Sequence, residues 1–175
     1  MTETLQDIKC PACQKVMKKI FVPKEGINID ICIDGCGGMY FDNRELTYFD
    51  EQTEGIDEIT DAIAEKKFEQ VNQSNFRTCP SCGARMVKNY TSTKKQVQID
   101  ECYSCGGKFL DVKELQELRN EYATEAERSA DIIALINQTV GPEIKKMEAE
   151  HQYALQHRSV LRKLFDSIIY SNSKI

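Results

Sequence analysis

The sequence lacks tryptophan, has only two histidines, and contains no apolar run near the roughly 20 residues that cross a bilayer. Two histidines offer little general-base chemistry near neutral pH, and no Ser/His/Asp set or phosphate-binding glycine loop is recognisable. We therefore expect neither an enzyme nor a membrane protein. The first residues are polar and acidic, without the basic start and apolar run of a signal peptide. This favours a cytoplasmic protein.

Positive charge is also scarce, because the formal net charge is −5 at pH 7. Affinity for duplex DNA depends on lysine and arginine that neutralise phosphates, so generic DNA binding is not expected. Residues 76–118 do carry a slight excess of lysine and arginine over aspartate and glutamate. Aromatic residues that could stack with single strands are not interleaved with these charges. Nucleic-acid binding therefore stays an alternative, with a local basic patch as its basis.

No cysteine lies outside four close pairs. These pairs are Cys10/Cys13, Cys32/Cys36, Cys79/Cys82 and Cys102/Cys105. In a reducing compartment thiols do not usually form disulfides, and paired CxxC groups typically bind metal. A CPxC motif is also found in dithiol oxidoreductases, but here a second cysteine pair follows each motif and the βαβ context is missing. The pattern favours zinc over redox chemistry or structural disulfides.

The chain contains one unit twice. Residues 10–13 (CPAC) recur as residues 79–82 (CPSC), and residues 36–46 match residues 105–115 at the same offset of 69 positions. Between the cysteine pairs of each unit, apolar residues alternate with polar ones around a polar turn, which is typical of a β-hairpin. A third short strand is expected after each second pair. The hairpin would bring both pairs of a unit together at one site.

The spacing predicts two Zn²⁺ ions per chain, each bound by four thiolates in a closed structural site. The first site would use Cys10, Cys13, Cys32 and Cys36, and the second Cys79, Cys82, Cys102 and Cys105. A unit of about 40 residues rarely folds on its core alone, and zinc binding contributes about 10–16 kcal/mol in zinc-finger peptides. We therefore expect each unit to be largely unfolded without metal and to fold independently of the other.

These motifs resemble the transcription factor IIB-type zinc-ribbon family of small bacterial proteins, in two tandem copies. The resemblance covers residues 10–46 and 79–115, and implies the same eight cysteine ligands. The first unit departs from the pattern, since Cys32 and Cys36 form a CxxxC that is one residue longer than the usual knuckle. On this ground we expect the first site to lose zinc more readily. The family name does not by itself establish a role in transcription.

The expected fold class is α+β, with two small β-rich Cys₄ ribbons, an acidic helical linker and a C-terminal helical hairpin or coiled coil. The expected segments are ribbon 1 (1–49), the linker (50–75), ribbon 2 (76–118) and the helical region (119–175). A helix should begin after each ribbon, where Asp42 precedes Glu45 and Asp111 precedes Glu114 by three residues. This spacing is typical of a capping box, which is favoured over a catalytic role for these carboxylates.

The tail has the apolar spacing of an amphipathic helix from residue 143 onward. Gly141 and Pro142 are expected to form a break between this helix and the preceding one. Its apolar stripe is expected to dock, either on the preceding helix or on a second chain. The expected stripe contains Ile144, Met147, His151, Ala154, Arg158, Leu161, Phe165 and Ile168. Together these features favour a non-enzymatic adaptor that binds a protein partner, with homo-oligomerisation through the tail as a possibility. The alternative is a nucleic-acid-binding or transcription-associated protein.

Overall fold

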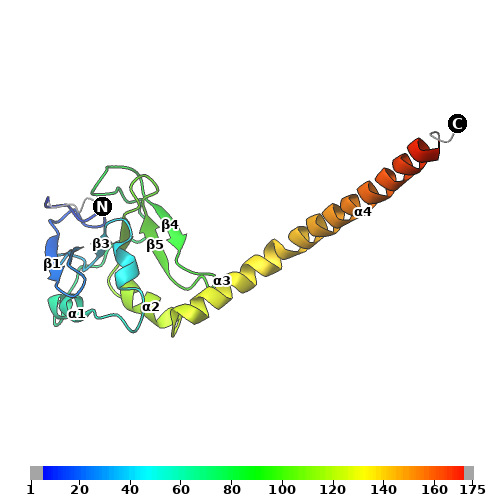
Figure 1. Cartoon of the computed structure of the whole chain (residues 1–175). Coiled ribbons are helices and arrows are strands. Elements are labelled where there is room, and N and C mark those ends of the chain that lie inside the picture. Colours follow the sequence, from blue (N-terminus) through cyan, green and yellow to red (C-terminus); the bar gives the residue numbers. More distant parts are fainter. Residues whose placement is uncertain (1–5, 172–175) are drawn as a thin grey trace. The chain divides into compact units, whose positions relative to one another are not determined.

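The computed structural model describes the backbone of residues 6–171, and the side chains of this range apart from Arg158, Ser159, Leu161 and residues 165–171. The chain forms two compact units, divided between Ser129 and Ala130. Among the described residues, all the strands lie in the first unit, and the described part of the second unit is helical apart from Val140 (Figure 1). The α+β fold with two cysteine-bearing β-hairpins is confirmed. The four-part division of the chain stays a prediction.

Each hairpin forms where the sequence alternates. In ribbon 1, β1 (Lys18–Val22) pairs with β2 (Ile27–Ile31), and β2 pairs with the short β3 (Met39–Phe41). In ribbon 2, β4 (Val87–Tyr90) pairs with β5 (Gln98–Glu101), and β5 pairs with β6 (Lys108–Leu110). All pairs are antiparallel, and the third strand expected in each unit is present.

The two ribbons share one sheet. Strand β3 pairs with β6, so the six strands follow the order β1-β2-β3-β6-β5-β4. Tyr40 lies opposite Phe109, Met39 opposite Leu110, and Phe41 opposite Lys108. Because Tyr40 and Phe109 occupy the same position of the repeat, this pairing relates the two ribbons by an approximate two-fold axis. The ribbons are thus joined edge to edge, which the repeat alone did not indicate.

Alternation along the central strands separates two groups of buried side chains. On one face, Met39, Phe41 and Leu110 join a single apolar core to which both ribbons contribute. The other face carries Tyr40 and Phe109, which pack among the cysteines. Each strand thus gives its side chains alternately to the core and to the metal sites, as its period of two requires.

The acidic segment between the ribbons is helical over fewer residues than expected. The α-helix α1 spans only Asp57–Ile63, and its Ile59 is buried in the shared core. The remainder of the segment is irregular, and it contacts ribbon 1: the Glu69 N–H donates to the Gly35 carbonyl at 3.0 Å. This segment therefore belongs to the packed first unit, because its few apolar residues and its backbone find partners there.

After each ribbon the glutamate of the expected capping box accepts a backbone hydrogen bond. The Glu45 carboxylate accepts from the Asp42 N–H, and the Glu114 carboxylate accepts from the Asp111 N–H, each at 2.7 Å. The first ribbon continues only into a 3₁₀ turn, η1 (Glu45–Tyr48), whereas the second continues into α2 (Glu114–Glu121). Arg119 of α2 donates to the backbone carbonyls of Phe49, Gln52 and Glu54. These bonds tie the second ribbon to the chain that leaves the first.

The tail consists of α3 (Glu125–Thr139) and α4 (Gly141–Ser171). Only Val140 separates them, and helical bonds cross this point, from the Val140 N–H to Ile136 and from the Ile144 N–H to Val140. Proline is tolerated here because it occupies the start of a helix, where its missing N–H matters least. The two helices therefore do not form a hairpin. No helix among the described residues is both long enough and apolar enough to cross a membrane.

Candidate metal centres

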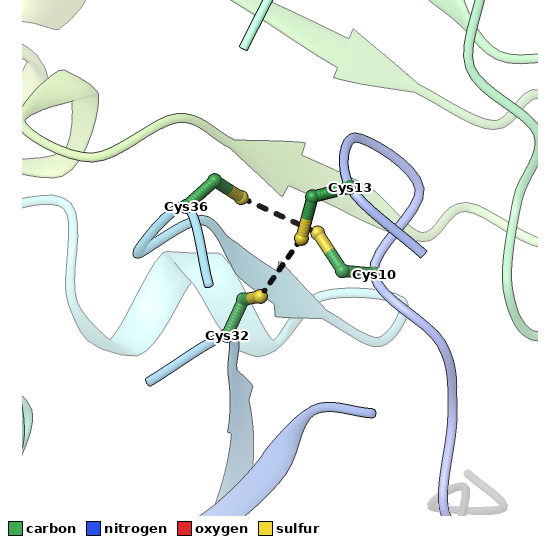
Figure 2. A group of neighbouring side chains, drawn as sticks. All are labelled: Cys10, Cys13, Cys32 and Cys36. Carbon is green, nitrogen blue, oxygen red and sulfur yellow. Dashed lines mark hydrogen bonds between the residues drawn. The ribbon is translucent and has the colours of Figure 1, made fainter. Parts of the chain in front are cut away.

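The structure brings the eight predicted cysteines together in two groups of four. The first contains Cys10, Cys13, Cys32 and Cys36, and the second contains Cys79, Cys82, Cys102 and Cys105. Within each group all the sulfur atoms lie within 4.8 Å of one another. In each case one pair comes from the turn before the hairpin and the other from the turn after it. Figure 2 shows the sulfurs of the first group pointing toward a common centre.

The sulfur–sulfur distances suit a tetrahedral ion. In the first group, Cys10 and Cys36 are 3.4 Å apart, and Cys13 and Cys32 are 3.3 Å apart. In the second group the corresponding distances are 3.5 Å and 3.4 Å. Four sulfurs at about 2.3 Å from a central Zn²⁺ would be about 3.8 Å apart, so small adjustments would complete either site. All eight cysteines are free thiols, with no disulfide between them.

The proton balance of the first group also calls for a cation. The hydrogen bond with Cys32 raises the pKa of Cys10, while the hydrogen bond with Cys10 lowers the pKa of Cys36. Four crowded sulfurs cannot all ionise in the absence of a positive charge, so they share their protons. A Zn²⁺ ion stabilises four thiolates at once and displaces these protons. Two Zn²⁺ ions, one for each group, fit the residues present.

The longer knuckle of the first site is accommodated by a glycine. A Cβ atom on Gly35 would lie 2.7 Å from the Cys32 sulfur and 2.8 Å from the Cys13 sulfur, so no larger residue fits there. The turn closes with the Gly37 N–H donating to the Cys32 carbonyl at 3.0 Å. In the second site the Gly106 N–H makes the corresponding bond to Cys102 at 2.7 Å. The extra residue is therefore absorbed in the turn, and the four sulfurs still converge.

The two sites differ in their exposure. In the first site three cysteines are buried and only Cys13 is partly exposed. In the second, Cys82 is exposed and Cys105 partly exposed. A hydrogen bond from the Ala84 backbone lowers the pKa of Cys82 to about 7. The order of zinc release stays a prediction, but this exposure favours the second site as the first to lose its metal.

Sequence reasoning did not identify two further groups of buried residues. Tyr40 and Phe109 each reach from one ribbon to the metal site of the other, a contact that depends on the β3–β6 pairing. Arg77 is 2% exposed and donates to Asp100 at 2.6 Å and to Asp111 at 2.7 Å. Its guanidinium also lies 4.7 Å from the centre of the Phe109 ring. The second glycine of each Cys-Gly-Gly is the one signal in the sequence, since it leaves room for a neighbouring ring.

Comparison with known proteins supports the same interpretation. A family model described as a transcription factor zinc-finger, the zinc ribbon of the transcription factor IIB type, matches residues 9–48 and again residues 78–121. The two matched regions contain the two cysteine groups, one in each. No curated protein and no solved structure matches the chain.

Proposed function

We propose that this chain, which carries two tandem zinc ribbons of the transcription factor IIB type, is a non-enzymatic adaptor that binds other proteins. Four thiolates occupy every position around a tetrahedral Zn²⁺, so neither site keeps a position for water or substrate. Zinc would then serve to hold the shape of the ribbons. Eight free cysteines suit a reducing compartment, which supports a cytoplasmic location.

The observation that carries this proposal is the exposed apolar surface of the tail. None of the residues of α3 is buried, although this helix and the described part of α4 contain many large apolar side chains. Those that are exposed include Ile132, Ile133, Leu135, Ile136, Val140, Ile144, Met147 and Leu155. Apolar surface of this extent on a protein is typical of an interaction site.

We infer that a second copy of the chain covers one row of this surface. Ile133, Val140, Met147 and Ala154 recur at intervals of seven residues, and Leu161 and Ile168 continue the interval in the sequence. A strict seven-residue apolar repeat is typical of a left-handed coiled coil. Met147 is 68% exposed and Val140 is 44% exposed, so pairing of two tails would remove both from water. The side chains of Leu161 and Ile168 lie outside those that the structure describes.

Self-association can be tested on the full chain by light scattering and sedimentation. The wild type should be dimeric, and the double variant Val140→Glu, Met147→Glu should be monomeric with two bound zinc ions. Gln152→Glu is the matched control, because position 152 lies on the opposite side of the helix from the seven-residue row. A monomeric wild type at micromolar concentration would contradict pairing through the tail.

The adaptor role needs a separate experiment. Proteins captured by the wild-type chain should be identified by mass spectrometry, and each candidate should then be purified and its binding measured by calorimetry. Binding should be weakened when Val140 and Met147 are both changed to Glu, because these changes place charge on the exposed apolar surface of the tail. If no purified candidate binds the wild type more tightly than this variant, the adaptor proposal is wrong.

A specific observation also favours nucleic-acid binding as a second candidate. Ribbon 2 exposes aromatic rings that the sequence pattern did not indicate: Phe76 is 77% exposed and Tyr103 is 68% exposed. The Arg85 guanidinium lies 3.5 Å from the centre of the Phe76 ring. An exposed ring with a stacked cation is a surface on which an unpaired base can stack. The overall charge of −5 nevertheless opposes strong binding to duplex DNA.

Fluorescence anisotropy with labelled single strands and duplexes at about 150 mM salt would test this candidate. If nucleic acid is the ligand, single strands should bind more tightly than duplexes, and Phe76→Ala should weaken binding. Tyr48→Phe, a change in ribbon 1, should leave the affinity unchanged. Ordinary non-specific binding has a Kd no weaker than about 100 μM. If single strands do not bind below this concentration, nucleic-acid binding is wrong and only the adaptor role is left.

A further inference from the structure

The two central strands exchange aromatic rings between the metal sites. Tyr40 belongs to β3 of ribbon 1, but its hydroxyl reaches the cysteines of ribbon 2. Phe109 belongs to β6 of ribbon 2, and its ring lies against Gly38 of ribbon 1. Because Tyr40 and Phe109 are directly opposite in the β3–β6 ladder, the same pairing places both rings. The two sites thus have equivalent neighbours, except that only the tyrosine carries a hydroxyl.

The Tyr40 hydroxyl lies 3.3 Å from the Cys79 sulfur and 3.9 Å from the Cys105 sulfur. Tyr40 is 1% exposed, so water does not compete for this contact. Gly107 leaves the room that the hydroxyl occupies, since a Cβ atom there would overlap the hydroxyl oxygen. A phenol has an ordinary pKa of about 10 and is therefore protonated at neutral pH. A thiolate has no proton to give, so the Tyr40 hydroxyl can act toward it only as the donor.

A hydrogen bond of this kind changes the chemistry of a metal-bound thiolate. A donor holds the sulfur in place and withdraws part of its negative charge, which makes it less ready to take up a proton or to leave the metal. Groups that orient metal ligands in this way typically contribute 10–100-fold to metal affinity. Cys79 and Cys105 come from different pairs of the second site, so one hydroxyl supports both halves of the site.

We propose that Tyr40 is a positioning residue of the second zinc site, where its hydroxyl donates a hydrogen bond to the Cys79 thiolate. The second site is then completed by a residue of the first ribbon and holds its metal at full strength only while that ribbon is folded. The first site receives the ring of Phe109 without a hydroxyl, and therefore does not gain the same bond. The exposed side of the second site, at Cys82, lies outside this protection.

Tyr40→Phe removes only the hydroxyl and keeps the ring, so it tests the bond directly. In the full chain loaded with two zinc ions, release to a chromogenic chelator should become about 10-fold faster for the second site and stay unchanged for the first. With ¹¹³Cd in place of zinc, the resonance of the second site should shift while that of the first remains. Chains that lack the cysteines of one site assign the two signals.

Tyr103→Phe is the matched control. It removes a hydroxyl beside the ligand Cys102, but that hydroxyl accepts from Asn89 at 2.6 Å. This variant should release both metals at wild-type rates. The proposal would be overturned if Tyr40→Phe released both metals at wild-type rates and left both ¹¹³Cd resonances unshifted. An effect confined to the first site would also overturn it.

If Tyr40→Phe fails to fold with two metals, a measurement on the wild type can test the hydrogen bond. In the ¹¹³Cd-loaded wild type, the Tyr40 hydroxyl proton should show a coupling across the hydrogen bond to the cadmium of the second site. Its detection would support the proposal, and its absence would overturn it.

Discussion

Ribbon 1 and ribbon 2 have the same motif and the same strand order, but they bury different chemistry at equivalent positions. Arg77 of ribbon 2 corresponds to Ile8 of ribbon 1, and both are buried. Ribbon 1 therefore packs an apolar side chain where ribbon 2 has a cation between two carboxylates. The cysteines and the hairpin are therefore common to both ribbons, whereas the buried residues at positions 8 and 77 differ in chemistry.

Replacing Arg77 of ribbon 2 by isoleucine, the residue type at the equivalent position of ribbon 1, should produce the largest loss of stability. Arg77→Ile would leave Asp100 and Asp111 buried without the cation that pairs with both. Removing one partner of a buried ion pair typically destabilises a protein by about 3–5 kcal/mol. Urea unfolding of the zinc-loaded chain should show this loss. Lys18→Met is the control, because its ion pair with Asp34 is exposed and should contribute little to stability.

Removal of one metal should show that the ribbons do not fold independently, contrary to the expectation from the repeat. Chains with Cys10 and Cys13 both changed to Ser, or Cys79 and Cys82 both changed to Ser, keep one intact site. Because the sites share a sheet and a core, each loss should weaken zinc binding at the other. Linkage requires the two factors to be equal, and typical couplings are about 5–150-fold. Competition with a chelator measures the zinc affinity of the remaining site in each chain. Wild-type zinc affinity at the remaining site of either chain would indicate that the ribbons fold independently.

The longer knuckle of ribbon 1 predicts a direct effect on zinc binding at the first site. Gly35→Ala would push a methyl group against the Cys32 and Cys13 sulfurs, and overpacking of this kind costs about 1–3 kcal/mol. The first site should therefore bind zinc more weakly, while the second changes only through the coupling between the sites. Gly55→Ala is the control, since a Cβ atom there meets nothing within 4 Å. Unchanged zinc affinity of the first site in Gly35→Ala would show that the turn can shift freely.

The helix that follows ribbon 2 predicts a dependence on pH. Burial raises the pKa of Glu114 to about 7, above its value in the unfolded chain. Its contribution to stability is therefore present below the unfolded pKa and is lost as pH rises through about 7. Glu114→Gln keeps an oxygen for the Asp111 N–H and removes the titration. The free energy of unfolding of the variant should exceed that of the wild type by about 1–3 kcal/mol at pH 8. The difference should be smaller at pH 6.

Thermal unfolding of the zinc-loaded chains at several pH values between 6 and 8 would measure this difference. Glu117→Gln, a change at an exposed position of the same helix, should show no such trend. A difference between Glu114→Gln and the wild type that stays constant with pH would contradict the assignment to Glu114.

The smallest expected effect is the order of zinc release. The exposed Cys82 gives a chelator access to the second site, whereas the first site has three buried cysteines. Stepwise chelation of the ¹¹³Cd-loaded chain should therefore remove the signal of the second site first. Earlier loss of the first signal would support the opposite order, which follows from the CxxxC spacing.

The cysteine groups, the hairpins and the third strands could all be predicted from the sequence. These depend on contacts close in the chain: alternation sets each strand, and the cysteine spacing sets each site. The fold class followed from the same patterns. For the linker, the pattern indicated a longer helix than α1, because acidic residues with sparse apolar ones do not show where the chain leaves the helix to pack on ribbon 1.

The way in which the two ribbons combine could not be predicted from the sequence and is seen in the folded chain. The pairing of β3 with β6 joins residues 69 positions apart in the repeat, and no local pattern specifies which strand edge finds which partner. That pairing carries Tyr40 to Cys79 and Phe109 to Gly38. It also follows from the chemistry of sheets, because a three-stranded ribbon leaves an edge with unpaired backbone groups, and a second copy of the same ribbon can satisfy them.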